Sequence, residues 1–207
     1  MDSKFLNLEQ EKRDRILNAA LAEFAQRGYK QASTNQIVKD AGISKGALFH
    51  YFKNKKDLYL SLYDHFIDLF LTQMQEQLDW TEKDIFIRNR KLASIKIELF
   101  HRYPEIFNFL NSVLTEDARE IQKALQVRRE TFLSQNYKEM MADIDPSPFR
   151  EGVDVDKAVD VITWSLEGFS YRQQAKVKGR KLDEIDLEEV LDELDDYIEV
   201  LKQSFYQ

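Results

Sequence analysis

The sequence predicts an all-α protein, built from an N-terminal unit of three short helices and a larger C-terminal helical unit. Apolar residues recur at spacings of three and four along most of the chain, which is the period of amphipathic helices. The 207 residues include only 3 prolines and 6 glycines, so few positions interrupt a helix. We expect the two units to span residues 1–53 and 54–207.

Charge is unevenly divided along the chain. Residues 1–60 hold 11 Lys and Arg against 7 Asp and Glu, a net charge of +4, whereas the whole chain carries −7. The remaining residues therefore carry −11. A basic segment within an acidic chain is typical of a part that meets the phosphates of nucleic acid. The acidic remainder is expected to be a solvated surface that phosphates repel.

Other composition features exclude several classes of protein. The chain has no cysteine, so it has neither disulfides nor thiolate chemistry, which suits a reducing cytoplasm. Its first ten residues are polar and resemble no signal peptide. No stretch approaches the roughly 20 apolar residues of a membrane span. We therefore expect a cytoplasmic protein without a membrane partner.

The first helix is expected from about residue 8 to residue 27. Its apolar residues share one face, and they are Ile16, Leu17, Ala20, Leu21 and Phe24. Gly28 follows the last of them, and a glycine just past a helix end is a common terminator.

The next two helices form a helix-turn-helix pattern. Ser33 and Gln36 have the spacing of a capping box at the start of the second helix, and Gly42 makes the turn after it. Ser44 caps the third helix, which places Leu48 and Phe52 on one side. Two short helices joined by a tight glycine-containing turn form the motif whose second helix reads DNA.

The opposite side of the third helix carries small, basic and aromatic groups. Lys45 and His50 can bond to phosphates or base edges, while Gly46 and Ala47 permit close approach of another surface. A glycine inside a helix costs about 1 kcal/mol relative to alanine, so Gly46 suggests a compensating contact. The alternative is an ordinary amphipathic helix with a tolerated glycine.

The C-terminal unit is expected to contain six further helices. Asn54 or Asp57 caps the first of them, and Pro104 occupies the first position of the third, where its missing amide is tolerated. A loop with two prolines and a glycine separates the fourth from the fifth. The expected ranges are 54–79, a helix capped by Thr81 that carries Ile85 and stops before Pro104, a short one from 104, 116–142, 156–178 and 187–205.

The helix expected over 156–178 carries two apolar stripes. One is Ala158, Ile162, Leu166, Phe169 and Gln173, and the other is Val161, Trp164, Gly168, Tyr171 and Ala175. The last helix has apolar residues at helical spacing from Leu187 to Phe205. This surface could be buried inside one chain or could pair with a second copy.

The N-terminal residues resemble the signature of the TetR family of bacterial transcriptional repressors. The resemblance extends over about Arg13 to Leu62, and several separate elements agree at the right spacing. Phe49 stands where the family often has tyrosine, and Val38 where alanine is common. The elements are Gly28-Tyr29, Ser33-Thr34, Ile37, Ala41 to Gly46, Leu48 to Phe52 and Lys55 to Leu58.

The resemblance implies a homodimeric repressor that binds palindromic operator DNA and responds to a small apolar or aromatic effector. The expected DNA-binding residues are Ser33, Thr34, Lys45, Gly46, Ala47, Phe49, His50, Tyr51, Lys55 and Lys56. The expected effector-binding residues are Phe66, Phe70, Met74, Phe100, Phe107, Tyr137, Trp164, Glu167 and Tyr171. The expected dimer interface is Ile162, Leu166, Phe169, Leu194, Ile198 and Leu201. The aromatic residues could equally fill a solid core, and Glu98, Glu139 or Glu167 could favour a cationic effector.

The sequence offers no constellation for catalysis or metal binding. Its three histidines are far apart, and neither zinc-binding spacing nor a phosphate-binding glycine loop occurs. We expect no enzyme activity, no cofactor and no metal. Two alternatives to a ligand-controlled repressor stay open: a helical protein-interaction module, and a constitutive DNA-binding regulator without an inducer.

Overall fold

The computed structural model describes residues 3–132, 143–178 and 180–207, and in these ranges the chain folds into helices joined by short connections. The prediction of an all-α fold is confirmed. The helices are α1 (Ser3–Leu6), α2 (Gln10–Gln31), α3 (Thr34–Ala41), α4 (Lys45–Tyr51), α5 (Lys55–Gln77), α6 (Ile85–Arg102), α7 (Pro104–Val113), α8 (Arg119–Phe132), α10 (Val155–Val177), the 3₁₀ turn η2 (Leu182–Glu184) and α11 (Leu187–Phe205).

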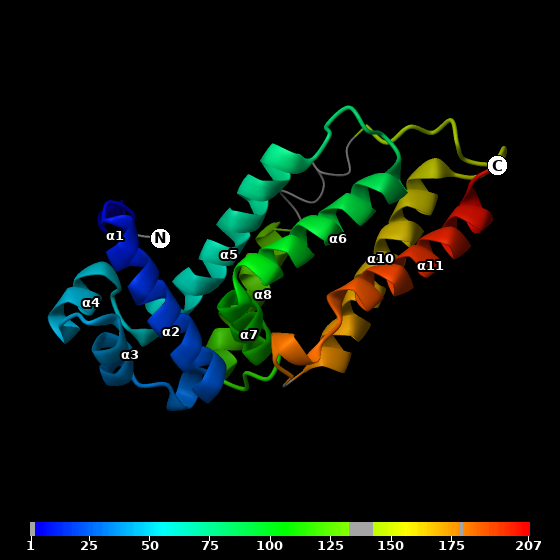
Figure 1. The fold of residues 1–207 in the computed structure, drawn as a ribbon. Helices are drawn as coiled ribbons and strands as arrows, with labels where there is room; N and C mark the ends of the chain where they lie inside the picture. The colour runs from blue at the N-terminus through cyan, green and yellow to red at the C-terminus, as the bar shows by residue number, and fades with distance from the viewer. Residues whose placement is uncertain (1–2, 133–142, 179) are drawn as a thin grey trace.

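The helices form an elongated molecule (Figure 1). Helices α1 to α4 gather at one end, and α5 leads from them towards the middle, where α6, α7 and α8 lie. Helices α10 and α11 run antiparallel at the other end, close to the C-terminus. Pro104 opens α7, as its position in the sequence predicted.

The N-terminus differs from the sequence prediction. The first helix was expected from about residue 8, but a short α1 precedes α2, and α2 begins at Gln10. Phe5 of α1 is fully buried, with its ring centroid 5.0 Å from that of Phe52. The stretch before α2 is too short to show a helical period, and only the contacts of Phe5 with α4 and its C-cap reveal where it packs. Gly28 breaks the helical backbone with φ of 65° as expected, yet the chain resumes a helical turn to Gln31.

The caps expected in the helix-turn-helix are present. The side chains of Ser33 and Ser44 each accept a hydrogen bond from the amide three residues further on. Asn54 caps α5 in the same way, and Asp57 accepts a bond from the amide just before Asn54, so the two cap the helix reciprocally. Gly42 adopts φ of 66°, which ends α3 in the left-handed conformation that glycine tolerates.

A continuous apolar core connects the helix-turn-helix to the rest of the molecule. Helix α2 packs along α7 as well as against α3 and α5. At that junction the fully buried rings of Phe24, Tyr59 and Phe109 meet edge-on, and the centroid of Tyr59 lies 4.9 Å from Phe24 and 5.0 Å from Phe109. These contacts tie the helix-turn-helix to the rest of the molecule by apolar burial.

Candidate nucleic-acid interface

The recognition helix, α4, is held by its inner face. Leu48 is fully buried and Phe52, at its C-cap, is 1% exposed and packs on Phe5 of α1, so both anchor α4 in the core. The serine cap at its start and the glycine turn before it fix the angle between α3 and α4. The outer face of α4 is thereby turned away from the core.

The outer face of α4 presents the groups that the sequence predicted. Lys45, Gly46, Phe49 and His50 are exposed, and Ala47 is half-buried. A Cβ added at Gly46 would lie 3.9 Å from its nearest neighbour, the Oγ of Ser44, which is an ordinary contact. The packing of the chain itself therefore does not require glycine at position 46.

Tyr51 lies at the edge of this outer face. Its ring packs edge-on against Phe5 of α1 with the centroids 5.8 Å apart, and the side chain is half-buried. The His50 ring lies beside it, with the centroids 5.4 Å apart. Phe5 thus supports the last turn of the recognition helix from behind.

The start of α3 flanks the recognition helix. Ser33 is exposed, and its amide donates to Oε1 of Glu23 at 2.8 Å. Thr34, the first residue of α3, is half-buried. The free amides of the first turn give this end of α3 a partial positive charge that suits a phosphate.

Lys55 and Lys56 make contacts within the chain. The ammonium of Lys55 donates to the carbonyl oxygens of Lys30 and Ala32, each at 3.1 Å, and lies 4.8 Å from the ring centroid of Tyr29. The ammonium of Lys56 lies 3.7 Å from Oε2 of Glu120. The resemblance implied that both lysines bind DNA, but the sequence did not reveal these partners within the chain.

The end of α2 contacts a cluster of acidic residues. These residues lie in the α7–α8 connection and at the start of α8. Glu116, which is buried, accepts hydrogen bonds from the amides of Tyr29 at 2.8 Å and Ala118 at 2.9 Å. Asp117 pairs with Lys30 at 2.7 Å. The hydroxyl of Tyr29 donates to Glu120, and burial together with this carboxylate raises the pKa of Tyr29 to about 12. No sequence pattern predicted these contacts between α2 and the acidic cluster, because the residues that make them lie about 90 positions apart in the chain.

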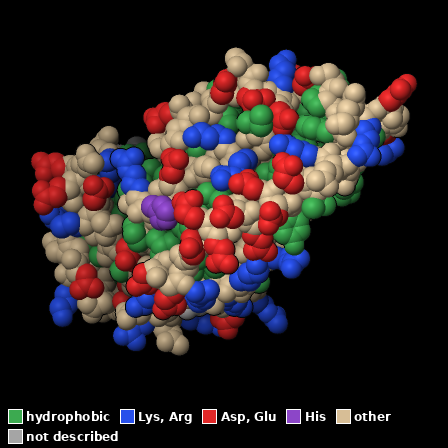
Figure 2. Space-filling model, turned by 45° about the vertical axis from the view of Figure 1, so that its right-hand side comes forward, with side chains coloured by type: hydrophobic (Ala, Val, Ile, Leu, Met, Phe, Trp, Pro, Cys, Tyr) green, Lys and Arg blue, Asp and Glu red, His purple; other side chains and the backbone are tan. Residues whose placement is uncertain are grey.

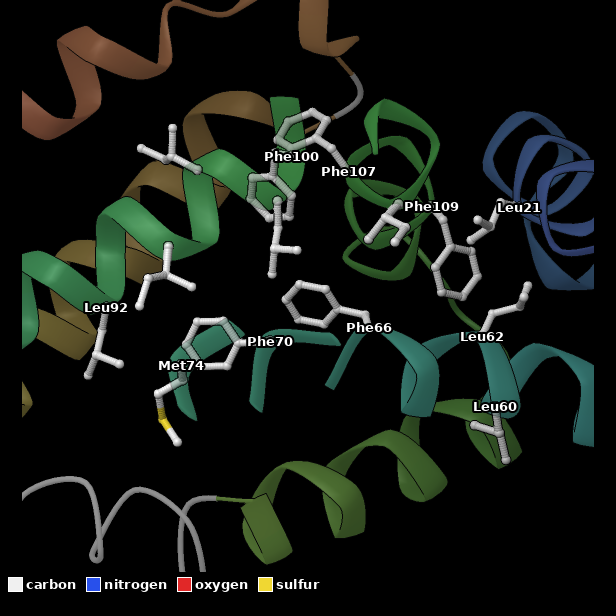
Figure 3. Close-up of a cluster of buried hydrophobic side chains, with 14 of the residues drawn as sticks. Leu21, Leu60, Leu62, Phe66, Phe70, Met74, Leu92, Phe100, Phe107 and Phe109 are labelled. Atoms are coloured by element: carbon white, nitrogen blue, oxygen red, sulfur yellow. The ribbon is translucent and has the colours of Figure 1, made fainter. Parts of the chain in front are cut away.

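The predicted effector-binding residues on α5, α6 and α7 come together in the structure (Figure 3). Phe66, Phe70, Met74, Phe100 and Phe107 are all buried. The Phe100 centroid lies 6.1 Å from Phe66 and 5.1 Å from Phe107, and Phe70 lies 6.3 Å from Phe66. We call these five residues the aromatic cluster. Tyr137 falls outside the described residues.

The other predicted effector-binding residues lie on α10, away from the aromatic cluster. Trp164 and Tyr171 are 64% and 45% exposed, and Glu167 is half-buried. Tyr171 lies under the guanidinium of Arg129 from α8, at 4.2 Å from its ring centroid. Glu98, considered for a cationic effector, is exposed.

The predicted dimer-interface residues are mostly buried within one chain. They pack α10 against α11 and the rest of the core, and Leu201 alone among them is half-buried. The exposed apolar side chains of these two helices are a different set, which we call the outer stripe. It consists of Val161, Trp164, Tyr171, Tyr197 and Val200.

Charged side chains of both signs cover the face seen in Figure 2, with small apolar areas between them. Within the described ranges, no group of three or more His, Asp or Glu side chains is arranged to hold a metal ion. None of the described helices has the length and apolar character needed to cross a membrane.

Comparison with known proteins places these features in a family. Residues 16–62, which span the helix-turn-helix, match the family described as bacterial regulatory proteins, tetR family. The fatty acid metabolism regulator protein of Bacillus subtilis is 29% identical over 140 residues, covering 55% of this chain and 72% of that protein. The regulator QacR of Staphylococcus aureus is 30% identical over 113 residues, covering 55% of this chain and 51% of that protein. The Bacillus subtilis regulator YuxN is 41% identical over 64 residues. This match covers 31% of this chain and only 22% of YuxN.

Solved structures share the fold over nearly the whole chain. A TetR-family regulator from Syntrophomonas wolfei has a TM-score of 0.71 at 20% identity, covering 93% of this chain and 95% of that one. FadR from Bacillus subtilis, solved in complex with stearoyl-CoA, has a TM-score of 0.62 at 19% identity, covering 91% of this chain and 96% of that one. Residues 16–62, with the helix-turn-helix, thus match the tetR family of bacterial regulatory proteins, and the chain shares its fold with solved TetR-family transcriptional regulators.

Proposed function

We propose that this protein is a homodimeric repressor that binds palindromic operator DNA through α4 and releases it when an apolar effector binds. The outer face of α4 carries the proposal. It presents Lys45, Gly46 and His50 on a helix whose other face is locked into the core. A rigid helix with small and basic exposed residues fits the major groove.

The residues on this face would take different roles. His50, with Ala47 and Phe49, would meet base edges, and Gly46 would let the backbone approach the duplex. Lys45 would hold a phosphate, as would Ser33 and Thr34 at the start of α3, where backbone amides point outward. Tyr51 would contribute from the edge of α4.

Lys55 and Lys56 would contribute to DNA binding in another way. Because Lys55 holds two carbonyl oxygens at the end of α2, it would set the position of the segment that leads into α3. Lys56 would meet a phosphate only by leaving Glu120. Their removal would therefore change the geometry of the DNA-binding end as well as its charge.

A dimer is proposed because one recognition helix reads too few base pairs for useful discrimination. Two copies related by twofold symmetry would read half-sites about 34–36 Å apart, or a multiple of that spacing. The outer stripe of α10 and α11 supports this, because it leaves aromatic side chains such as Trp164 in contact with water. Leu201 lies half-buried on the same helix as Tyr197 and Val200.

Effector control is proposed from the aromatic cluster and from the relatives. A fold neighbour was solved with stearoyl-CoA, and a relative is named for fatty acid metabolism, which supports an effector with an apolar chain. The cluster lies along α5, and α5 starts at the helix-turn-helix. An effector that parts the cluster would favour one arrangement of the two ends over another. DNA and effector would then weaken each other's binding by the same factor.

Salt-dependent DNA binding tests this function. Once an operator has been selected, Lys45→Ala should weaken binding similarly on all sequences and reduce the slope of log affinity against log salt by about one. His50→Ala should instead change which base pairs are preferred. Lys178→Ala, which removes an exposed lysine just after the C-terminal end of α10, serves as the control. If the protein shows no salt-sensitive affinity for duplex DNA, the helical interaction module becomes the better account.

A further inference from the structure

Lys96 is a charged residue in the middle of the apolar face of α6. On a helix, residues four apart share a face, and the residues four before and four after Lys96 are Leu92 and Phe100. Both are buried, at 7% exposure each. Lys96 itself is half-buried, whereas Glu98, two residues later on the other side, is exposed. The periodicity of α6 therefore directs this lysine inward.

The surroundings of Lys96 are aromatic. Its ammonium lies 5.8 Å from the ring centroid of Phe100, which itself packs against Phe66 and Phe107. This puts the charge at the aromatic cluster between α5 and α6. Burial lowers the pKa of the Lys96 ammonium from its ordinary value.

No carboxylate neutralises Lys96 in the part of the chain that the structure describes. Its ring contact with Phe100 is the interaction seen for its ammonium there. By contrast, Lys91 on the same helix donates to the side-chain oxygen of Gln77, and Lys176 on α10 pairs with Glu193. An ammonium among apolar groups loses hydration that a ring face only partly replaces. A methionine or leucine at position 96 would fill the same space without that loss.

We propose that Lys96 is the counter-ion for the acidic head group of an effector whose apolar chain lies among the rings of the aromatic cluster. This proposal rests on the proposed effector control and adds the charge of the effector to it. The ligand class is an amphiphile with one apolar chain ending in a carboxylate or a phosphate. A neutral molecule would leave Lys96 without a partner, and a cation would be repelled. The lysine therefore discriminates between ligands both by attracting anions and by disfavouring neutral molecules and cations.

Four probes with the same ten-carbon chain separate these possibilities. Decanoate and decyl phosphate carry the two acidic head groups, 1-decanol is neutral, and decyltrimethylammonium is cationic. Calorimetric titration into the full-length protein gives each affinity. We expect both anions to bind at least about tenfold more tightly than 1-decanol, because hydrogen bonds to charged groups contribute more than neutral ones. We expect the cation to bind most weakly.

Variants at position 96 assign the preference to this lysine. Lys96→Met keeps the length of the side chain and removes the charge, so it should lose about tenfold affinity for the anions while leaving 1-decanol binding unchanged. Lys96→Arg should keep the preference for anions. Lys91→Met, on the same helix but engaged with Gln77, is the matched control and should behave as wild type.

The outcomes separate this inference from the function on which it rests. Equal affinity of the wild type for decanoate and 1-decanol, or an undiminished anion preference in Lys96→Met, would overturn the role of Lys96 and leave effector control in place. If none of the four probes bound to the protein and none caused it to release DNA, effector control would be overturned as well. A preference for decanoate over decyl phosphate, or the reverse, identifies the head group while supporting the proposal.

Discussion

At the scale of single residues, Glu116 links the DNA-binding end to the rest of the chain. Its buried carboxylate accepts one hydrogen bond from the amide of Tyr29, just after the break in α2, and one from Ala118 at the start of α8. A Cβ added at Gly28 would also lie 3.6 Å from this carboxylate. One side chain therefore fixes the end of α2 relative to α8.

Glu116→Ala should lower the free energy of unfolding by about 1–3 kcal/mol, because it leaves a partly buried backbone amide without its acceptor. Glu116→Gln keeps an acceptor oxygen and should be milder. Urea unfolding followed by circular dichroism measures both. Asp117→Ala is the control, since its partner is exposed and the pair is solvated. An effect of Asp117→Ala as large as that of Glu116→Ala would refute the special role of the buried carboxylate.

His65 on α5 makes stability depend on pH. Burial lowers its pKa below the ordinary value, although the nearby Asp68 acts in the opposite direction. Well above the ordinary pKa of about 6.5, the imidazole is uncharged in both the folded and the unfolded state. As the pH falls below about 6.5, the unfolded chain gains a proton that the folded protein resists, so stability falls.

His65→Gln should therefore flatten the pH dependence of the free energy of unfolding between pH 7 and pH 5. The equivalent change at the exposed His101 should leave the wild-type dependence in place. Denaturation curves at several pH values give the comparison. An unchanged slope in His65→Gln would show that other groups produce the dependence.

At the scale of elements, replacing two glycines of the helix-turn-helix by alanine should change the stability of the fold in opposite directions. Gly42 has φ of 66°, where a side chain costs about 1–2 kcal/mol, so Gly42→Ala should destabilise the fold by about that amount. Gly46 lies in a helix with room for a Cβ, so Gly46→Ala should stabilise it by up to about 1 kcal/mol. Thermal unfolding checks both signs.

Gly46→Ala should nevertheless weaken operator binding, because the added methyl group keeps the backbone of α4 away from the duplex. A fluorescence polarisation titration measures this beside the stability data. A variant that is more stable and binds the operator as tightly as wild type would show that Gly46 has no role in the approach to DNA.

Local chemistry explains which elements could be predicted from the sequence. Ser33, Gly42, Ser44 and Asn54 act on backbone groups within three or four residues, so their spacing was enough to predict the helix-turn-helix and the start of α5. The partners of Lys55 and Glu116 lie about 25 and 90 residues away along the chain. No local pattern carries that information.

The two apolar stripes of α10 show that the sequence also could not predict which face of a helix is buried. Periodicity revealed both, but it could not say which one the chain buries in its own core. The structure buries Ile162, Leu166 and Phe169 and leaves Trp164 and Tyr171 exposed. On α10, the residues predicted for the dimer interface therefore lie in the core, and two of those predicted for the effector lie at the surface.

At the scale of the whole molecule, the outer stripe should hold two copies together. Trp164→Asp places a charge in the proposed interface and should convert the dimer to a monomer, because burying an unpaired charge is costly. Ile87→Asp is the matched control, as Ile87 is also an exposed apolar residue but lies on α6. Light scattering at micromolar concentration gives the mass. A wild-type monomer would contradict the dimer, and an intact Trp164→Asp dimer would show that the stripe is not its interface.

The opposite net charges of the two parts should orient the molecule on DNA. The first 60 residues carry +4 and the rest −11, so phosphates attract the helix-turn-helix and repel the regulatory end. One α4 offers few base contacts, so we expect two copies of the DNA-binding end to act together.

Selection of bound sequences from a pool of random duplex DNA tests this account most directly. The account predicts strong enrichment of one inverted repeat, with half-sites centred about one helical turn or a multiple of it apart, and loss of that enrichment in His50→Ala. Recovery of a pool without any enriched sequence, or of a single unrepeated site, would contradict a dimeric repressor that reads its operator through α4.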